Sequence, residues 1–539
     1  MKIFNQKADL VLLGGKIITI DKDFTVAQAV AAKNGIIIAV GTDQELRDWI
    51  GVETRVLNLK GKTVVPGFID SHIHALIYGM DLLKINCGTP PNNSLFDILD
   101  RVKKAAHTTP PGKWIMCSEY KHLLLKEKRL INRWDLDQVA QKNPVLLPTL
   151  HALSLNGCAL EIAGITRETP DPPGGRIEKD PNTGEPTGVV FETAVKPVLA
   201  LIPTPHHTDY SRMLGIVSQE LLKEGITSIH EAGGVEDIEN AALFRAYQDL
   251  LKTGPLRVRA YVMMTIHSYK DLQEIKNFGF YTGFGNEWLR IGPIKTFIDG
   301  TFVSRNVAIN PPSVDDSLGI LVWQKEELVE VVKELHQLGW QICGHALGDR
   351  GIGLLLDAYE AALNNFSRTN HRHRIEHSGI TLPAIQNRYR KLGVMVAAQP
   401  NLLHFFGSNF HFYGPERMRW IYPFRSLLGQ GIVVSGGSDC RATPFAPTHG
   451  IWSAVTRIER NSGKVLVPEE RISVKEALKM FTINGAYASF EEDVKGSIEP
   501  GKYADMVVLD QDPLNIEVDQ LKEMRVLFTI LGGNVVYSV

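Results

Sequence analysis

With 539 residues, the chain is too long for one simple hydrophobic core, so its length predicts a large domain combined with a smaller one. A formal net charge of −2, with 22% charged residues, excludes the strongly basic composition of a nucleic-acid binder and an acidic tail. The five cysteines are scattered and form no C-x-x-C pair, which is typical of free thiols in a reducing compartment and predicts a cytoplasmic protein.

Short β-branched runs separated by glycine-rich breaks occupy residues 8–65 and predict a small β-sandwich. The first run contains Asp9 and no small-residue cleavage site, so we interpret it as strands rather than a signal peptide. Similar runs return near the C-terminus, in GSIEPGKYADMVVLD and RVLFTILGGNVVYSV. One composite sandwich is therefore predicted from residues 1–65 and 485–539. No apolar run approaches the ~18 residues of a membrane span, so no membrane partner is expected.

Residues 66–484 alternate strand-like runs with amphipathic segments such as 325–338, which predicts an α/β domain with a parallel sheet. This alternation yields eight predicted strands, the number that a (β/α)8 TIM barrel needs. The predicted strands lie at residues 68–74, 225–231, 258–264, 292–298, 340–345, 373–377, 394–399 and 432–438. The stretch between the first two strands is far longer than one βα unit, so a large insertion after strand 1 is predicted at about residues 85–210.

Polar side chains that can bind a metal ion end several of these strands. His72 and His74 end the first strand, and residues two apart on a strand point to the same side. Alone, such a pair fits a surface strand as well as a metal site. Barrel active sites form at the carboxyl ends of strands, where four more candidates lie: Lys295, His345, His377 and Asp439. Four imidazoles and a carboxylate suit zinc or a related divalent ion.

Lys295 on strand four has two interpretations. An ammonium group would repel metal ions, whereas reaction with CO2 forms a carbamate, an anionic oxygen ligand that can bridge two metals. Burial lowers the pKa of a lysine and favours that reaction. The alternative is an ion pair with Asp299 or Glu376, and spacing alone does not decide between them.

Several motifs resemble the metal-dependent amidohydrolase superfamily, namely PGFIDSHIH, the strand-end histidines, GSDC and the closing GSIEPGKYADMVVLD. More narrowly, IKTFIDGTFVSR, HALGDRGI, HRIEHS and TPDPPGGRI resemble the YtcJ-like branch, which includes N-substituted formamide deformylases. The resemblance covers nearly the whole chain and implies a barrel with a terminal β-sandwich. The ligands that it implies are His72 and His74 for one metal ion, His345 and His377 for the second, a carbamate on Lys295 as the bridge, and Asp439.

The activity implied by the resemblance is hydrolysis of a non-peptide carbon–nitrogen bond in an N-substituted formamide or another small N-acyl amide. Metals lower the pKa of bound water toward ~7, so a metal-activated hydroxide is the expected nucleophile. Asp439 is expected to take the proton of that water and pass it to the leaving amine. The alternatives are a cyclic amide (lactam) hydrolase or deaminase of the same superfamily, which generally lacks the strand-four lysine, and a non-catalytic scaffold, which should have lost ligands.

Three further residues are candidates for substrate contact: His151 in the insertion, His230 at the end of strand two and Gln399 at the end of strand seven. A surface role suits His151 equally well, and support of a metal ligand suits His230 equally well. The aromatic-rich residues 402–424 follow strand seven and are expected either to favour an apolar or aromatic substituent, or to pack against the insertion or a second subunit. We expect a homodimer, the usual default, and no nucleic-acid partner.

Overall fold

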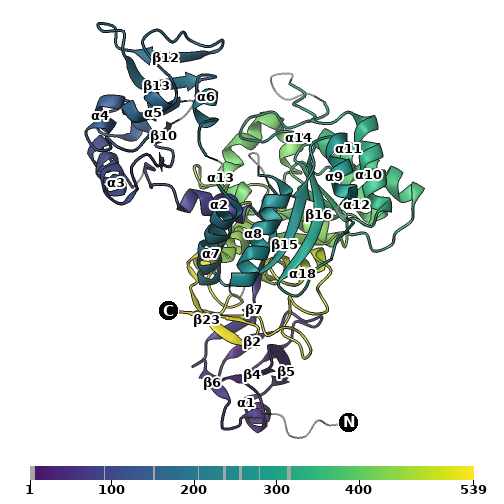
Figure 1. The fold of residues 1–539 in the computed structure, drawn as a ribbon. Helices are drawn as coiled ribbons and strands as arrows, with labels where there is room; N and C mark the ends of the chain where they lie inside the picture. The colour runs from purple at the N-terminus through teal and green to yellow at the C-terminus, as the bar shows by residue number, and fades with distance from the viewer. Residues whose placement is uncertain are drawn as a thin grey trace. The chain divides into compact units, whose positions relative to one another are not determined.

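The computed structural model describes residues 7–89, 91–149, 152–203, 205–234, 238–253, 258–277, 279–311 and 317–539 (Figure 1). The chain divides into two compact units. The first, here named the barrel unit, comprises Met1–Ala75 and Leu214–Val539; the second, named the insertion unit, comprises Leu76–Met213. Within the described residues, no helix is both long enough and apolar enough to cross a lipid bilayer.

Eight parallel strands form the central sheet of the barrel unit, in the order β8, β14, β15, β16, β17, β18, β19 and β20. Their bounds are Phe68–Ile73, Ile226–Glu231, Arg259–Thr265, Leu289–Phe297, Ile342–Ala346, Arg374–His377, Met395–Ala398 and Val434–Gly436. The first and last strands meet, because the Asp439 amide donates to the His72 carbonyl at 2.8 Å and the His74 amide donates to the Cys440 carbonyl at 2.8 Å. The predicted eight-stranded α/β barrel is therefore confirmed.

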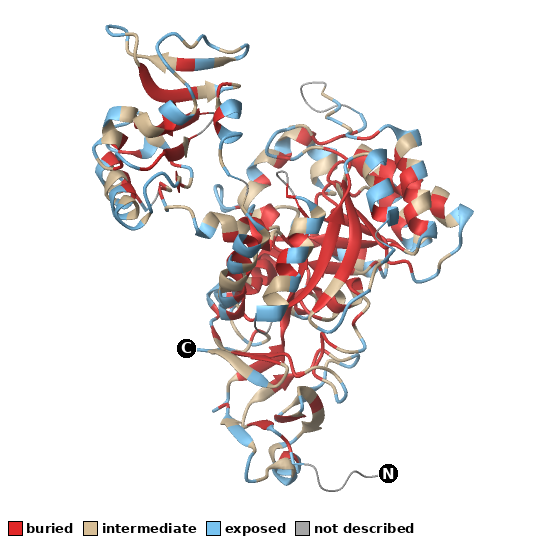
Figure 2. Cartoon of the chain, viewed as in Figure 1, coloured by how far each residue is buried: buried red, intermediate tan, exposed pale blue. Residues whose placement is uncertain are grey.

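Helices cover the outside of this sheet, so its strands are buried on both faces (Figure 2). In the helix α10 (Lys325–Gln337), Leu328, Val331, Val332 and Leu335 form the buried stripe expected of an amphipathic helix. The other helices of the unit are α1 (Asp43–Leu46), α8 (Asn240–Thr253), α9 (Tyr269–Asn277), α11 (Asp349–Asn365), α12 (Pro383–Leu392), α13 (Asn401–Phe406), α14 (Pro415–Met418), α15 (Phe424–Gly429), α16 (Pro447–Thr456), α17 (Val474–Met480) and α18 (Ile483–Ala488).

Two smaller sheets hold strands from the ends of the chain. One has the order β5, β4, β1, β6, with bounds Ile36–Gly41, Ala29–Lys33, Leu10–Leu13 and Arg55–Asn58. The other has the order β23, β22, β21, β7, β2, β3, with bounds Asn534–Ser538, Val526–Leu531, Met506–Leu509, Thr63–Pro66, Lys16–Ile18 and Val26–Ala27. Because β7 pairs with β21, residues more than four hundred positions apart share one sheet. The predicted domain boundaries themselves stay predictions.

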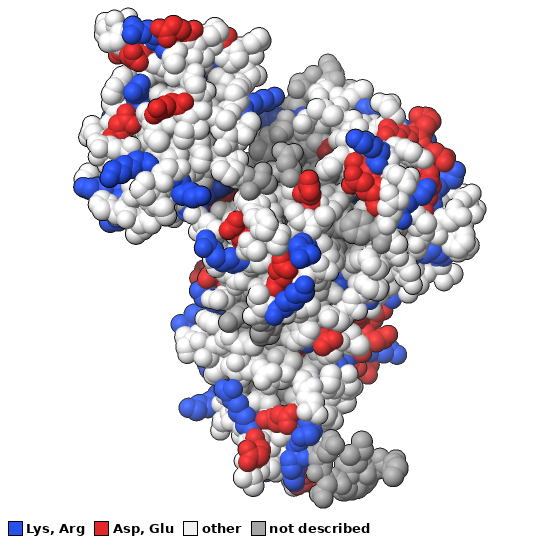
Figure 3. Space-filling view, in the orientation of Figure 1, with Lys and Arg blue, Asp and Glu red and all other residues white. Residues whose placement is uncertain are grey.

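The insertion unit has its own mixed sheet, in the order β12, β13, β11, β10, β9, with bounds Gly175–Lys179, Pro186–Glu192, Ala152–Leu155, Val145–Thr149 and Ile115–Met116. Its helices include α3 (Leu95–Thr108), α4 (Arg133–Asp137), α5 (Gly157–Ile162) and α6 (Val195–Leu199), while α2 (Ala75–Leu82) and α7 (His207–Lys223) lie at its two ends. The Ser94 hydroxyl and the Asp97 carboxylate form a capping box that explains where α3 begins. Charged side chains of both signs are spread over the face in view, in keeping with the small net charge (Figure 3).

Three buried histidines beside β17 and β18 form a hydrogen-bonded chain away from the candidate site. His373 Nδ1 accepts from the Ile342 amide at 3.0 Å, so its Nε2 carries the proton and donates to His336 Nδ1 at 2.9 Å. His336 Nε2 then donates to the Phe366 carbonyl at 2.7 Å, and His371 Nδ1 accepts from the His373 amide at 3.0 Å. Burial lowers the pKa of all three rings, that of His371 to about 4, so this packing requires neutral histidines.

Acid is expected to destabilise the fold by protonating these three hydrogen-bonded histidines. Because folding depresses these pKa values below 6.5, the unfolded state binds more protons. The contribution is complete above pH 6.5 and is lost as the pH falls from 6.5 toward about 4, at about 1.4 kcal/mol per unit of pKa depression. Urea denaturation should therefore show a lower midpoint at about pH 5 than at about pH 7.5. If the His371→Gln variant shows the same difference in urea midpoint between the two pH values as wild type, this explanation is wrong.

Candidate metal centre

Imidazole and carboxylate groups meet at the carboxyl end of the barrel. The Nε2 atoms of His72 and His74 each lie 3.6 Å from Asp439 Oδ1. One ligand atom from each of these three residues lies within 4.8 Å of the others, a spacing that fits one metal ion. This group follows from the closure of the barrel, since β8 supplies the histidines and the turn after β20 supplies the aspartate.

The three other predicted metal-binding residues lie in the same place. The ring centroids of His345 and His377 are 4.5 Å apart, and those of His72 and His377 are 4.9 Å apart. Lys295 Nζ lies 3.3 Å from His72 Nε2. The structure thus brings together, from strands far apart in the sequence, all six side chains that the sequence singled out.

Lys295 is buried, with 1% of its surface exposed. Burial lowers its pKa, although the charges of Asp439 and Glu376 oppose the shift. The two carboxylates considered as ion-pair partners are engaged elsewhere. Asp299 accepts hydrogen bonds from the amides of Leu347, Gly348 and Ala308 at 2.9, 2.8 and 3.2 Å, and Glu376 binds Arg374 and His72. A buried amine with a lowered pKa has the reactivity that carbamate formation requires.

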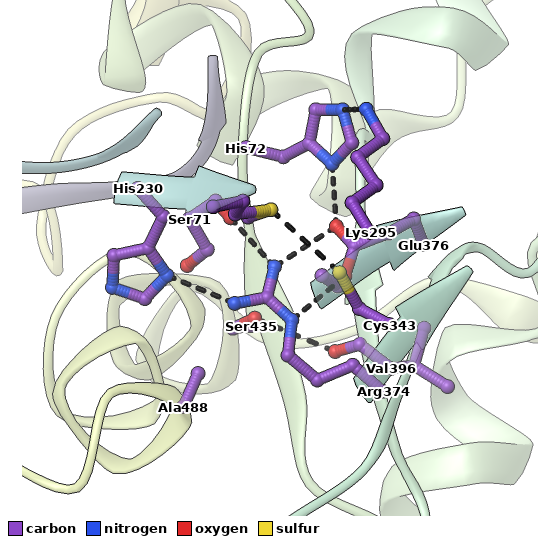
Figure 4. Close-up of polar contacts among 12 residues, drawn as sticks. Ser71, His72, His230, Lys295, Cys343, Arg374, Glu376, Val396, Ser435 and Ala488 are labelled. Atoms are coloured by element: carbon purple, nitrogen blue, oxygen red, sulfur yellow. Dashed lines mark hydrogen bonds and ion pairs between the residues drawn. The ribbon is translucent and has the colours of Figure 1, made fainter. Parts of the chain in front are cut away.

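His72 is oriented by a buried chain of polar residues (Figure 4). Its Nδ1 bonds Glu376 Oε2, which leaves Nε2 facing Asp439. Arg374 binds both oxygens of Glu376, with Nε–Oε1 at 2.7 Å and Nη2–Oε2 at 2.9 Å. On the other side of Arg374, its Nη1 lies 3.0 Å from His230 Nδ1. His230 is thus placed to support the Arg374–Glu376 pair, and its predicted contact with substrate stays a prediction.

Hydrogen bonds orient the two other histidines. His345 Nε2 donates to the Gly300 carbonyl at 3.0 Å, which leaves Nδ1 as its lone-pair nitrogen. His377 Nδ1 donates to Gln399 Oε1 at 2.6 Å, which leaves Nε2 as the lone-pair nitrogen. Gln399 is buried and its Nε2 donates to the Ala397 carbonyl at 3.0 Å, so both ends of its amide are occupied. In this arrangement Gln399 holds the His377 ring, and its predicted substrate contact stays a prediction.

Gln399→Leu is expected to weaken metal binding by about 10- to 100-fold, because the variant keeps the size of the side chain but removes the acceptor that orients His377. Competition with a chelator would measure the change in affinity. Gln386→Leu is the matched control: this buried glutamine donates to the Thr381 carbonyl at 2.8 Å, so its loss should lower stability and leave metal affinity unchanged. Equal metal affinities in wild type and Gln399→Leu would contradict the positioning role.

Two aspartates, Asp439 and Asp70, lie where the first and last strands of the barrel meet. Burial raises the pKa of Asp439 to about 7, while the nearby charge of Lys295 opposes the shift. Asp70 Oδ1 accepts from the amides of His72 at 3.1 Å and Ser438 at 3.0 Å. Asp70 therefore ties the first strand to the turn that carries Asp439.

The donor set fits divalent metal ions. It offers imidazole nitrogens whose second nitrogen is in several cases already hydrogen-bonded, together with a carboxylate oxygen, and this is the pattern of protein metal sites. Sequence reasoning missed Arg374 and treated Glu376 only as a partner of Lys295. The available signal was the alternation in HRIEH, which places Arg374 and Glu376 on one face of a strand. His151 lies outside the described residues.

Comparisons with known proteins identify the family of this chain. The model of the amidohydrolase family matches residues 55–537. N-substituted formamide deformylase of Arthrobacter pascens is 31% identical, covering 99% of both chains, and the putative amidohydrolase YtcJ of Bacillus subtilis is 28% identical, covering 97% of this chain and 98% of its own. An uncharacterized metal-dependent hydrolase of Pyrococcus furiosus superposes with a TM-score of 0.76 at 26% identity, covering 94% of this chain and 100% of its own. The chain therefore belongs to the amidohydrolase family and is a hydrolase acting on carbon–nitrogen bonds.

Proposed function

We propose that this protein hydrolyses the carbon–nitrogen bond of an N-substituted formamide or another small N-acyl amide. The observation that carries the proposal is the convergence of His72, His74 and Asp439 on one point, with Lys295 Nζ 3.3 Å from His72 Nε2. The similarity over 99% of both chains to a formamide deformylase supports the substrate class. It also favours a linear amide over the cyclic amides and deamination substrates considered as alternatives.

The proposed ligands divide into two groups around Lys295. His72 and His74 would hold one divalent ion and His345 and His377 would hold a second, and zinc suits their nitrogens. Lys295, as a CO2-derived carbamate, would be a ligand shared by both ions, and its formation is supported by the burial and lowered pKa of that amine. Asp439 completes the set through Oδ1, which lies 3.6 Å from two of the histidines.

Each residue of the site has its own role in the proposed reaction. When bound, divalent ions supply the Lewis acidity that polarises a carbonyl group and makes water acidic enough to react near neutral pH. Asp439 takes the proton of the attacking water and later gives it to the leaving nitrogen, acting first as general base and then as general acid. The Arg374–Glu376 pair and Gln399 keep the histidine rings in position.

Aromatic side chains beside the metal centre support a substrate with an apolar or aromatic substituent. Phe297 lies beside the centre: Lys295 Nζ is 5.0 Å from its ring centroid, and its centroid lies 5.8 Å from that of His345. Residues 402–424 pack on the loop that follows β16, where the ring centroid of Phe302 lies 4.9 Å from that of Phe410 and 5.2 Å from that of Tyr413. An apolar wall next to a few polar groups is typical of small-molecule sites.

The proposal also covers the cellular location, the assembly and the domain boundaries of the protein. The five free cysteines in the described part of the chain support a reducing, cytoplasmic environment. We propose a homodimer as the default assembly of such an enzyme, which light scattering would test. The pairing of β7 with β21 supports the proposed composite sandwich of residues 1–65 and 485–539, and the compact unit at Leu76–Met213 supports the proposed insertion into a barrel of residues 66–484.

A hydrolysis screen would test the proposed function. The purified, zinc-loaded protein is incubated with formamides, acetamides, N-acyl amino acids, lactams and aminopurines, and released amine or ammonia is measured. We expect turnover of linear amides, with the highest kcat/KM for an N-substituted formamide. Turnover of lactams or aminopurines alone would favour the alternatives, and no turnover of any linear amide would overturn the proposal.

A further inference from the structure

We propose that the hydroxyl group of Tyr422 binds the carbonyl oxygen of the substrate and stabilises the negative charge that develops on that oxygen during hydrolysis. The inference rests on the proposed function and adds a residue to the same site. Nothing in the sequence singled out Tyr422, which is one of many aromatic residues in the segment 402–424.

The first observation is a buried hydroxyl without a partner. Tyr422 has 0% of its surface exposed, and among the described residues its Oη has no hydrogen-bond partner. Buried tyrosine hydroxyls normally find one, because leaving a polar group unsatisfied costs free energy. Two other buried tyrosines of the barrel unit follow that rule: Tyr359 Oη donates to the Arg374 carbonyl at 2.9 Å, and Tyr389 Oη bonds Ser378 Oγ at 2.8 Å.

The second observation is the location of Tyr422 among the catalytic loops. Its amide donates to the Gly379 carbonyl at 2.9 Å, and Gly379 lies two residues after the proposed ligand His377. Its ring centroid lies 6.2 Å from that of Phe302, on the loop that follows the strand of Lys295. Burial, together with the negative charges of Asp439 and Asp299, keeps the pKa of the phenol well above its ordinary value. The hydroxyl therefore remains a protonated donor that the charge of Asp439 reaches.

The third observation is that the backbone at Tyr422 is held rigidly. The buried guanidinium of Arg457 donates through Nη1 to the Tyr422 carbonyl at 2.7 Å and through Nη2 to the Ile421 carbonyl at 2.9 Å. Its Nε donates to the Leu466 carbonyl at 2.7 Å. Tyr422 itself has φ of 49°, in the left-handed region that bulky residues avoid. A donor fixed in advance pays no reorganisation when charge appears, which is the basis of oxyanion stabilisation.

In the proposed step, one proton passes through Asp439 and Tyr422 keeps its own. The oxygen of water forms a bond to the carbonyl carbon while Asp439 takes its proton, and the π electrons of the carbonyl move onto the carbonyl oxygen. Tyr422 donates a hydrogen bond to that oxygen and keeps its own proton. The electrons return as the carbon–nitrogen bond breaks, and the nitrogen leaves with the proton from Asp439. Formic acid, or another carboxylic acid, and an amine are the products, and the proton of the acid then passes to the amine or to solvent.

Tyr422→Phe tests the inference because it removes only the hydroxyl. We expect kcat to fall about 100-fold on the best amide of the screen, the usual effect of losing one oxyanion donor, while KM, metal content and melting temperature change little. Tyr359→Phe is the matched control: it removes a buried hydroxyl that has a partner, so melting temperature should fall and kcat should not. A Tyr422→Phe enzyme with the kcat of wild type would overturn the inference.

Binding of methylphosphonate, an anion with tetrahedral oxygens, provides a readout that needs no turnover. By calorimetry on the zinc-loaded proteins, we expect Tyr422→Phe to bind it at least about 10-fold more weakly than wild type; equal affinity would overturn the inference. If the wild-type protein hydrolyses no amide, the proposed function is wrong. The role of Tyr422 is still tested in that case, because phosphonate affinity needs no turnover. If Tyr422→Phe does not fold, 3-fluorotyrosine at position 422 strengthens the donor and should tighten phosphonate binding, and unchanged affinity would count against the inference.

Discussion

Replacement of Lys295 by alanine is expected to reduce the metal content below the two equivalents of zinc per chain expected for wild type and to lower kcat/KM by at least about 1,000-fold. The physical reason is that a bridging carbamate would be the one anionic group shared by both ions, and its loss leaves four neutral imidazoles and the single carboxylate of Asp439 facing two cations. Elemental analysis of the purified variant and the amide assay would measure the two effects. A wild type with one equivalent of zinc, unaffected by Lys295→Ala, would contradict the bridging carbamate.

Two controls make that experiment specific. Acetate added to Lys295→Ala should restore part of the zinc content and activity, because a small carboxylate can occupy the space left by the truncated side chain. Lys495→Ala removes another buried lysine, whose Nζ lies 2.7 Å from Glu491 Oε2 in a structural ion pair. This variant should lose stability and keep its zinc. Loss of zinc in both variants would indicate general unfolding rather than a missing bridge.

Asp439→Asn is expected to lower kcat by about 100- to 10,000-fold, the range that general acid–base catalysis contributes. The amide side chain keeps the shape and an oxygen for the metal but neither accepts nor donates the transferred proton at neutral pH. Steady-state kinetics with a formanilide would measure the loss.

The choice of leaving group separates proton transfer from metal binding in that variant. A 4-nitrophenyl ester expels a leaving group that needs no proton, so Asp439→Asn should slow ester hydrolysis less than amide hydrolysis. Asp349→Asn is the matched control, since this buried carboxylate accepts from the Asn310 amide at 3.1 Å and has no proposed role in the reaction. Equal losses on ester and amide would contradict the role of Asp439 as proton donor.

Sequence patterns predicted the barrel closely because its strands are short, strongly apolar runs at regular intervals. The predicted strand at residues 225–231 is observed as Ile226–Glu231, and the helix predicted at 325–338 as Lys325–Gln337. The last strand is shorter than predicted, Val434–Gly436 instead of 432–438, because only that part pairs with its neighbour β19. Strand-end positions also identified the six clustered residues, since parallel strands bring their carboxyl ends to one face.

By itself, the sequence determined the fold class and predicted which strand-end residues lie together, because periodicity and strand-end position are local properties of the chain. Only the tertiary structure decided how those residues are supported. The link from His72 through Glu376 to Arg374 spans more than three hundred positions, and the unpartnered hydroxyl of Tyr422 is defined by what surrounds it. Hydrogen bonds and burial depend on pairs of residues that no local pattern relates, so ring orientation, buried charge and the proposed oxyanion donor emerge only when the barrel closes.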